Sequence, residues 1–281
     1  MRPALFAVLS LVVGLATASG QALPTDEAGA IAYLTGRGVE IVKDADGHAT
    51  RLMSQGKTPL SAAEYALIGR LTHLEQVGLN AAPLTDGEWG FLRSLPRLKR
   101  LSIWHGHHFA GLGQFSGLPV EQLTIGGCMG LRDLHKEDPA AFRDAILTLK
   151  DLPNVTRLSV YHSPLLPGDE HVAHVVANCP KLESLMIDFA APRGMATTVT
   201  PAGLAALQKL PLTSLSLENV TTFTPAHFEA LAAIGTLDEL LIDARRSPVP
   251  PEDLAAFTTA RPDVAVAVAQ PGDAGPPRVA R

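Results

Sequence analysis

The chain has 281 residues, of which 46% are hydrophobic, 18% are charged and 5% are aromatic. This composition can bury a core and is too apolar for a disordered protein. The 28 acidic residues outnumber the 23 Lys and Arg residues, which gives a net charge of -5. The basic surface that a nucleic-acid binder needs is missing from these totals, so we expect no nucleic-acid partner.

The chain begins with a segment typical of an export signal. Arg2 precedes an apolar run over residues 4–18 in which only Ser10 and Thr17 are polar. This run is shorter than the roughly 20 residues that a membrane-crossing helix needs. We therefore expect residues 1–20 to be a signal peptide cleaved within residues 18–22, and a secreted or periplasmic product with no stable membrane span. A retained N-terminal anchor helix is the alternative.

The rest of the chain repeats an aliphatic pattern, Leu-x-x-Leu-x-Leu, in which other aliphatic residues replace some leucines. The middle positions of its seven copies are Val77, Leu101, Leu123, Leu158, Leu185, Leu215 and Leu240, spaced 22 to 35 residues apart. The alternation predicts a strand in each copy. Half-patterns at Thr50/Leu52 and at Val264/Val266/Val268 end the series.

Between the strands, the apolar residues recur every three or four positions, which predicts short helices. In chain order, these helices cover residues 60–71, 89–95, 140–149, 172–176, 204–210, 228–234 and 254–257. Ser61 and Thr85 are each followed three residues later by Glu, the capping-box pattern. One strand and one helix cannot bury an apolar face alone, so we expect neighbouring units to stack into a curved solenoid.

One unit carries a family likeness. Cys179-Pro-Lys-Leu-Glu-Ser-Leu-Met-Ile resembles the start of a unit in leucine-rich repeat proteins of the cysteine-containing, ribonuclease-inhibitor-like type. The resemblance covers residues 50–268. It implies an α/β leucine-rich-repeat solenoid, with a curved parallel sheet on the concave side, short helices on the convex side, and about seven full repeats plus terminal half-repeats. The Asn that usually follows the strand is absent, for example at Gly106, so we expect irregular curvature.

These patterns divide the chain after the signal peptide into three parts. Residues 24–48 are expected to form an N-terminal capping segment, residues 49–270 the solenoid, and residues 271–281, which lack periodic apolar residues, a disordered tail. The longest gaps between strands predict extra loops over residues 128–139 and 190–200 on one rim.

The residues between the aliphatic positions should line the concave face, because side chains alternate along a strand. Aromatic residues and Arg are typical of binding hot spots. We expect Trp104 and Tyr161 to flank a notch roughly 10 Å wide at Gly126, two strand spacings across. The alternative is that the two rings only pack on neighbouring strands. The candidate ligand-binding residues are Arg100, Trp104, His105, Arg157, Tyr161, His162, Asp188, Glu218 and Asp243.

The last three of these candidates form a column of like charges, for which a solvated acidic face is the favoured interpretation. His105 and His162 share a repeat position, and a metal site on this His-rich rim is the alternative to a surface loop without function. His171 and His174 lack the spacing of a zinc-protease helix and are interpreted as a solvated helix start.

The remaining motifs indicate no chemistry. Cys128 and Cys179 lie at opposite ends of strands two units apart, too far for a disulfide, so both are predicted to be free buried thiols. Asn154 and Asn219 begin glycosylation acceptor patterns, which matter only if the source glycosylates exported chains. No catalytic residue, metal or cofactor is predicted.

The sequence therefore favours an exported, non-catalytic binding protein that recognises a protein or glycan through its concave face. Two alternatives remain: a metal-binding or enzymatic protein that uses the rim around His105 and His162, and a structural component of an envelope assembly.

Overall fold

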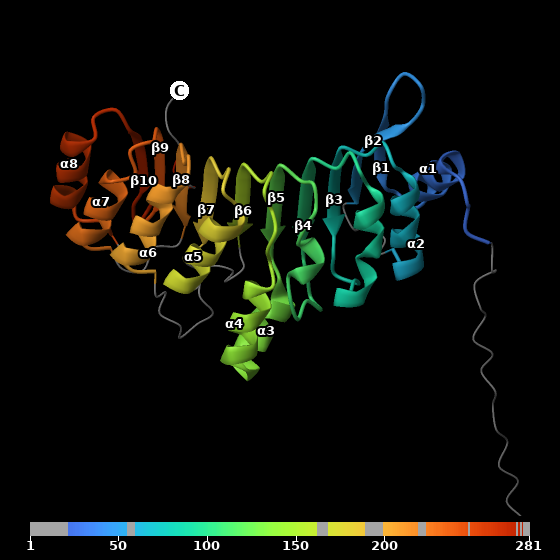
Figure 1. Ribbon diagram of the computed structural model, residues 1–281, viewed down its shortest axis with the longest axis horizontal. Helices are drawn as coiled ribbons and strands as arrows, with labels where there is room; N and C mark the ends of the chain where they lie inside the picture. Colours follow the sequence, from blue (N-terminus) through green and yellow to red (C-terminus); the bar gives the residue numbers. More distant parts are fainter. Residues whose placement is uncertain are drawn as a thin grey trace, which may run out of the picture.

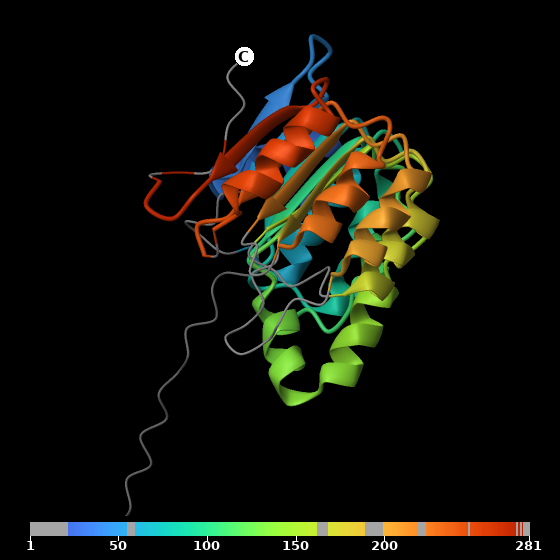
Figure 2. The same cartoon turned by 90° about the vertical axis from the view of Figure 1, so that its left-hand side faces the viewer.

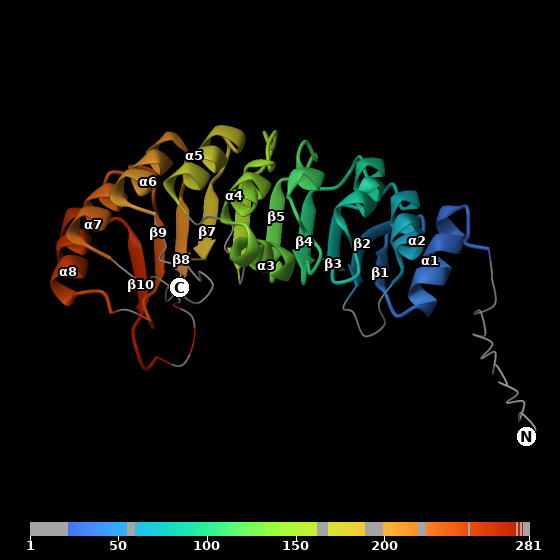
Figure 3. The same cartoon turned by 90° about the horizontal axis from the view of Figure 1, so that it is seen from below.

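The computed structural model of the chain has a ten-stranded sheet in the order β1 to β10, with helices between the strands. It describes residues 22–54, 60–161, 168–188, 199–218, 223–246, 248–273, 275 and 277. Figure 1 shows the strands side by side along the long axis of the molecule, and Figure 3 shows helices along the outer side of a shallow arc. The arrangement is α/β and is compatible with a repeat solenoid.

The strands are β1 (Glu40–Lys43), β2 (Ala49–Ser54), β3 (Gln76–Asn80), β4 (Arg100–Trp104), β5 (Gln122–Gly126), β6 (Arg157–Tyr161), β7 (Ser184–Asp188), β8 (Ser214–Glu218), β9 (Glu239–Asp243) and β10 (Ala265–Ala269). Strands β2 to β10 are parallel, and only the β1–β2 pair is antiparallel. The strands from β3 onward coincide with the predicted ones, because the alternating pattern is a local property of each segment.

The helices are α1 (Glu27–Gly36), α2 (Ala62–Ala66), α3 (Met129–Glu137), α4 (Pro139–Leu147), α5 (Asp169–Asn178), α6 (Pro201–Ala206), α7 (Pro225–Ala232) and α8 (Pro251–Ala260). Short 3₁₀ helices are η1 (Leu67–Arg70), η2 (Asp86–Glu88), η3 (Gly90–Ser94), η4 (Gly113–Phe115) and η5 (Leu207–Lys209). The predicted helix over residues 89–95 is therefore a 3₁₀ helix. Both predicted capping boxes form, at Ser61 and Thr85.

One backbone hydrogen-bond pattern recurs before nearly every parallel strand. The carbonyl of Glu75 accepts hydrogen bonds from the amides of Lys99 and Arg100, and the carbonyl of Lys99 accepts from the next pair in the same way. The same double acceptance occurs at the carbonyls of Glu121, Thr156, Glu183 and Thr213. The repeated pattern fixes the register of each strand on its neighbour and gives a hydrogen-bond partner to both amides at the start of the next strand.

The core lies between the sheet and the helices. In each parallel strand from β3 to β9 the aliphatic residues of the repeat are buried; Val77 and Leu79, for example, are fully inaccessible to solvent. The intervening residues face the other side of the sheet, which forms the inner side of the arc in Figure 3, away from the helices. Among the described side chains, the predicted ligand-binding residues Arg100, Trp104, Arg157, Tyr161 and Glu218 lie on this helix-free face.

The N-terminal segment adds a strand that the sequence analysis did not predict. Residues 40–43 form β1, which pairs antiparallel with β2 through a turn closed by Asp44. Helix α1 begins at Glu27, and the side chain of Asp26 accepts a hydrogen bond from the amide of Gly29 at 2.7 Å as its cap. The ion pair between Arg37 and Glu64 at 2.7 Å ties α1 to α2.

The prediction of a loop over residues 128–139 was wrong, because most of this segment forms helix α3. Helices α3 and α4 are joined at Asp138, whose side chain accepts hydrogen bonds from the amides of Ala140 and Ala141 at the start of α4. Figures 1 and 2 show both helices projecting beyond the end of β5. The other expected loop and the signal segment lie outside the described residues, apart from residues 199 and 200. Within the described part of the chain, none of the helices combines the length and apolarity needed to cross a membrane.

Candidate ligand-binding surface

The helix-free face of the sheet is lined by rows of side chains in register. In the row nearest the strand starts, Arg100 pairs with Gln76 on one side and Gln122 on the other, and Gln122 pairs with Arg157. Arg51 extends the row at its N-terminal end through Gln76. The register therefore produces an alternating Arg and Gln row across β2 to β6.

The N-terminal part of this row borders a cavity of about 460 Å³, lined by Thr50, Arg51, Glu75, Gln76, Lys99, Arg100 and Glu121. Two of its three cations are neutralised by neighbours: Arg51 forms an ion pair with Glu40, and Lys99 forms one with Glu75 at 3.1 Å. Arg100 is exposed and forms no ion pair or hydrogen bond with another side chain in the described part of the chain. Its guanidinium is therefore available to a ligand.

Arg157 repeats this situation two strands along the sheet. It is exposed, and it has no ion-pair partner among the residues that the structure describes. Two strand spacings separate it from Arg100, or about 10 Å. Between them, Gln122 is half-buried and supplies an amide at the same level. The face thus carries two unpaired guanidinium groups flanking an amide.

The notch expected between Trp104 and Tyr161 is not empty. A side chain at Gly126 would overlap the distal part of the Tyr161 ring, so this ring covers Gly126. The Trp104 ring leans in the opposite direction along the sheet, toward Gly78. A Cβ added to Gly78 would lie only 3.1 Å from the tip of this ring. Glycine leaves room on the sheet, and each aromatic side chain fills the room next to it. Both rings remain half-exposed.

One of the three expected acidic ligands, Asp243, does not lie on a solvated face. Asp243 is buried, and its carboxylate receives hydrogen bonds from the Arg245 guanidinium, including Nε to Oδ1 at 2.8 Å. These hydrogen bonds lower the pKa of Asp243. Glu218 is half-buried, and of Asp188 only the backbone is described. The interpretation of Asp243 as a solvated acidic side chain was therefore wrong. The spacing of residues in the sequence did not reveal that the side chain of Arg245 turns back to bind the carboxylate of Asp243.

The His-rich rim is only partly described. His105 is exposed and has a positive φ of 61°, and its ring stacks on that of His107 at a centroid distance of 6.1 Å. His162 lies outside the described residues, so the predicted pairing of His105 and His162 has no structural outcome. Within the described ranges, no third His, Cys, Asp or Glu converges with His105 and His107 into a three-ligand cluster.

Two other titratable groups lie inside the fold. His171 is 3% exposed, which contradicts its interpretation as part of a solvated helix start; helix α5 begins at Asp169, and this start turns His171 toward the core. Cys128 and Cys179 are both buried, and no disulfide joins them. Burial raises the pKa of the Cys179 thiol to about 12.

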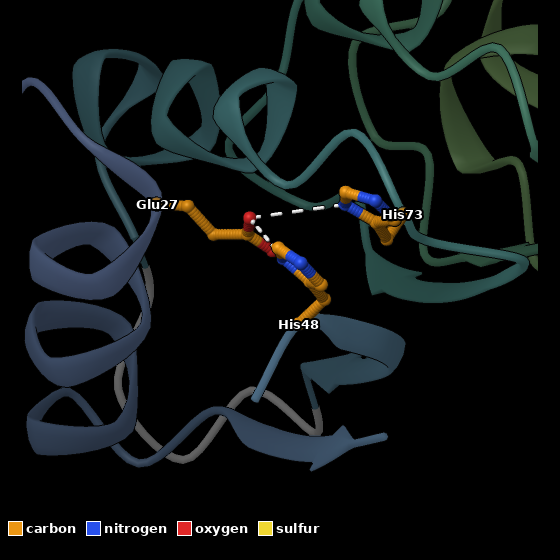
Figure 4. Close-up of side chains that lie close together, drawn as sticks. All are labelled: Glu27, His48 and His73. Atoms are coloured by element: carbon orange, nitrogen blue, oxygen red, sulfur yellow. Dashed lines mark hydrogen bonds and ion pairs between the residues drawn. The ribbon is translucent and has the colours of Figure 1, made fainter. Parts of the chain in front are cut away.

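One cluster escaped the sequence analysis altogether. Glu27, His48 and His73 offer three potential ligand atoms that lie within 4.8 Å of one another, and Figure 4 shows the three side chains converging from separate segments. The residues are 21 and 25 positions apart in the chain, a spacing that belongs to no metal motif. Only the packing of α1 against the start of the sheet brings them together.

Comparison with known proteins adds no family. No protein-family model matches the chain, and no curated protein sequence matches it either. The geometry of the surface described above is therefore the basis for assigning a function.

Proposed function

We propose that the protein is an exported, non-catalytic leucine-rich-repeat solenoid that binds a protein ligand through the helix-free face of its sheet. The observation that carries the proposal is the pair of exposed, unpaired guanidinium groups of Arg100 and Arg157, which lie in register on either side of Gln122. The ligand we expect is a protein segment that carries carboxylates about 10 Å apart, the separation of two strand spacings.

The repeat family is supported by two features of the chain. The Leu-x-x-Leu-x-Leu pattern places buried residues in consecutive parallel strands, and the carbonyl before each strand accepts two amides of the next unit. Both features are expected of stacked units that share one core. About seven full repeats, with residues 24–48 as a cap, account for this pattern.

The choice of an acidic protein ligand follows from the chemistry of the surface. Arg binds carboxylates with two parallel hydrogen bonds, which gives direction as well as charge attraction. The half-exposed rings of Trp104 and Tyr161 lie at the other end of the same strands and offer apolar area next to these charges. Arg, Trp and Tyr are the residue types that contribute most at protein interfaces.

Export is proposed from the apolar run over residues 4–18 alone. An exported protein meets its ligand outside the cytoplasm, so the ligand should be sought among envelope or secreted proteins. Glycan recognition by the same face, a metal-dependent activity at the rim of His105 and His162, and a purely structural role in an envelope assembly are the competing outcomes of the experiment.

The experiment is crosslinking in the native compartment, followed by identification of the attached molecules. It compares the unmodified chain with Arg100→Ala/Arg157→Ala and with Arg97→Ala/Lys209→Ala, a control that removes the same charge from exposed residues outside the rows described above. We expect one or more acidic proteins to be recovered with the unmodified chain and with the control, and to be lost with the double variant at Arg100 and Arg157.

The proposal is wrong if the three chains recover the same molecules. It is also wrong if the recovered ligand is a glycan without protein. Retention of the ligand at high salt would argue against charge pairing as the source of recognition, since exposed ion pairs are screened.

A further inference from the structure

We propose that Glu27, His48 and His73 form a binding site for one transition-metal ion of the Zn²⁺ class, at the junction of α1, the β1–β2 turn and the segment before β3 (Figure 4). The site shares no residue with the proposed ligand-binding face and does not depend on its function. The three donor residues lie far apart in the chain, in α1, just before β2 and just before β3. An ion bound there would therefore join the N-terminal segment to the first parallel strands.

The donor atoms already converge on one point. Nδ1 of His48 lies 2.9 Å from Oε2 of Glu27, and Nδ1 of His73 lies 3.8 Å from the same oxygen. Both dashed lines in Figure 4 end at this carboxylate. Two imidazole nitrogens and a carboxylate oxygen are a donor set that Zn²⁺ accepts, whereas Ca²⁺ and Mg²⁺ prefer oxygen ligands only.

The second supporting observation is an unsatisfied nitrogen. Nδ1 of His73 is inaccessible to solvent and has no hydrogen-bond partner, although it faces the carboxylate. Buried polar atoms without a partner are rare and call for an explanation. A metal ion between Nδ1 of His73 and Oε2 of Glu27 would give this nitrogen the partner that it lacks.

The carboxylate is also held in position from behind. Oε1 of Glu27 accepts a hydrogen bond from the backbone amide of Ala49 at 3.1 Å, which leaves Oε2 to face the two rings. Hydrogen bonds of this kind to the outer atom of a ligand orient it and raise metal affinity. The amide belongs to the first residue of β2, so the orientation of Glu27 is fixed by the sheet.

Metal binding requires one ring to turn. The rings of His48 and His73 are stacked, with centroids 3.8 Å apart and an interplanar angle of 17°. An ion bound near the plane of one ring would lie outside the plane of the other. The side chain of His48 is 40% exposed, against 26% for His73, so rotation of His48 about its Cβ–Cγ bond is the available movement. In a tetrahedral site the donor atoms would then lie about 3.4 Å apart, as bonds of about 2.1 Å require.

The ion would replace a proton. Nδ1 of His48 lies within hydrogen-bond distance of Oε2 of Glu27, and a proton held between these two atoms must leave before the nitrogen can bind a metal. Three protein ligands leave the fourth position of a tetrahedral ion to water. We therefore expect one ion per chain and stabilisation of the N-terminal segment.

The test uses the purified full chain after removal of metals with a chelator. Calorimetric titration with Zn²⁺ should show one ion per chain. His48→Gln and His73→Gln should each weaken binding at least tenfold, while His107→Gln, which changes an exposed histidine at the rim, should leave it unchanged. Circular dichroism shows whether each variant is folded.

Measurements on the unmodified chain test the site even if one of the variants fails to fold. Zn²⁺ should shift the imidazole resonances of two histidines in the NMR spectrum, and Co²⁺ should give the absorption of a tetrahedral ion. The inference is overturned if the unmodified chain takes up no stoichiometric metal, or if the folded variants at His48 and His73 bind Zn²⁺ as the unmodified chain does.

Discussion

The ring of Tyr161 occupies the space that a side chain on Gly126 would need, one strand away in the sheet. We predict that Gly126→Ala displaces this ring and destabilises the protein by about 1–3 kcal/mol, the usual cost of adding a methyl group to a packed site. Denaturant unfolding measures the loss, and the near-ultraviolet circular dichroism of tyrosine reports the displaced ring.

Gly235→Ala is the matched control, because a Cβ there would meet no atom within 4 Å. It should leave stability within about 0.5 kcal/mol of the unmodified chain. Equal losses from both substitutions would mean that backbone freedom, rather than contact with Tyr161, is what Gly126 supplies.

The strands and their order were accessible from the sequence because each strand carries its own alternating pattern. The register Arg100–Gln122–Arg157 follows from the same pattern, since parallel units stack position on position. Strand β1 was missed because its four residues are all at least partly exposed and show no alternation. Helix α3 was missed because charged residues and Gly130 dominate it.

The side-chain arrangement of the sites was less accessible. The rings of Trp104 and Tyr161 turn toward neighbouring glycines, a choice of rotamer that the strand pattern does not specify. Glu27 and His48 meet only because α1 packs beside the start of β2, and no pattern in residues 24–48 predicted that helix. The sequence therefore predicts which residues share a face of the sheet and which lie in register. It does not predict which side chains from distant segments meet, because that depends on how the helices pack against the sheet.

Arg261 closes the C-terminal end of the array through backbone carbonyls. Its Nη1 donates to the carbonyls of Ala232 and Ile234, and its Nη2 donates to that of Leu237 at 2.9 Å. The three carbonyls run from the last residue of α7 to the residues before β9, so the guanidinium holds this connection against α8. We predict that Arg261→Lys costs about 2–4 kcal/mol, because an ammonium cannot reproduce the planar set of donors.

Arg143→Lys is the control for Arg261→Lys. Arg143 is exposed and pairs with Glu170 at 2.6 Å, and exposed ion pairs contribute less than about 1 kcal/mol. Urea unfolding of both variants gives the comparison. A cost at Arg261 no larger than that at Arg143 would contradict a role for the carbonyl contacts.

Both cysteines should resist thiol reagents in the folded protein. Cys128 and Cys179 are buried, and a pKa of about 12 leaves Cys179 almost entirely protonated at neutral pH. We predict that neither thiol is labelled until denaturant is added, and that both are then labelled without prior reduction.

Ala45→Cys supplies the control for labelling, since residue 45 is exposed in the β1–β2 turn. This added thiol should react at once in the folded chain. An intact mass two hydrogens below that of the free dithiol would show a disulfide and contradict the prediction.

His171 should make the protein less stable in acid. Neither ring nitrogen has a hydrogen-bond partner, and burial lowers the pKa of His171 below its ordinary value of about 6.5. The unfolded chain therefore takes up a proton on this residue at a pH where the folded chain does not. Stability from this group is complete above about pH 6.5 and falls as the pH drops, by at most about 1.4 kcal/mol per pH unit.

His171→Leu removes this proton and should flatten the dependence of unfolding free energy on pH between about pH 8 and about pH 5. The pKa of His227 is also lowered by burial. The unfolding free energy of the His171→Leu variant should therefore still fall in acid, but less than that of the unmodified chain. His107→Gln, at an exposed position, should retain the slope of the unmodified chain. If the slope were the same with and without His171, the ring would have to be protonated in the folded protein, and the neighbouring Glu170 carboxylate, 4.0 Å from Nδ1, would then be its counter-ion.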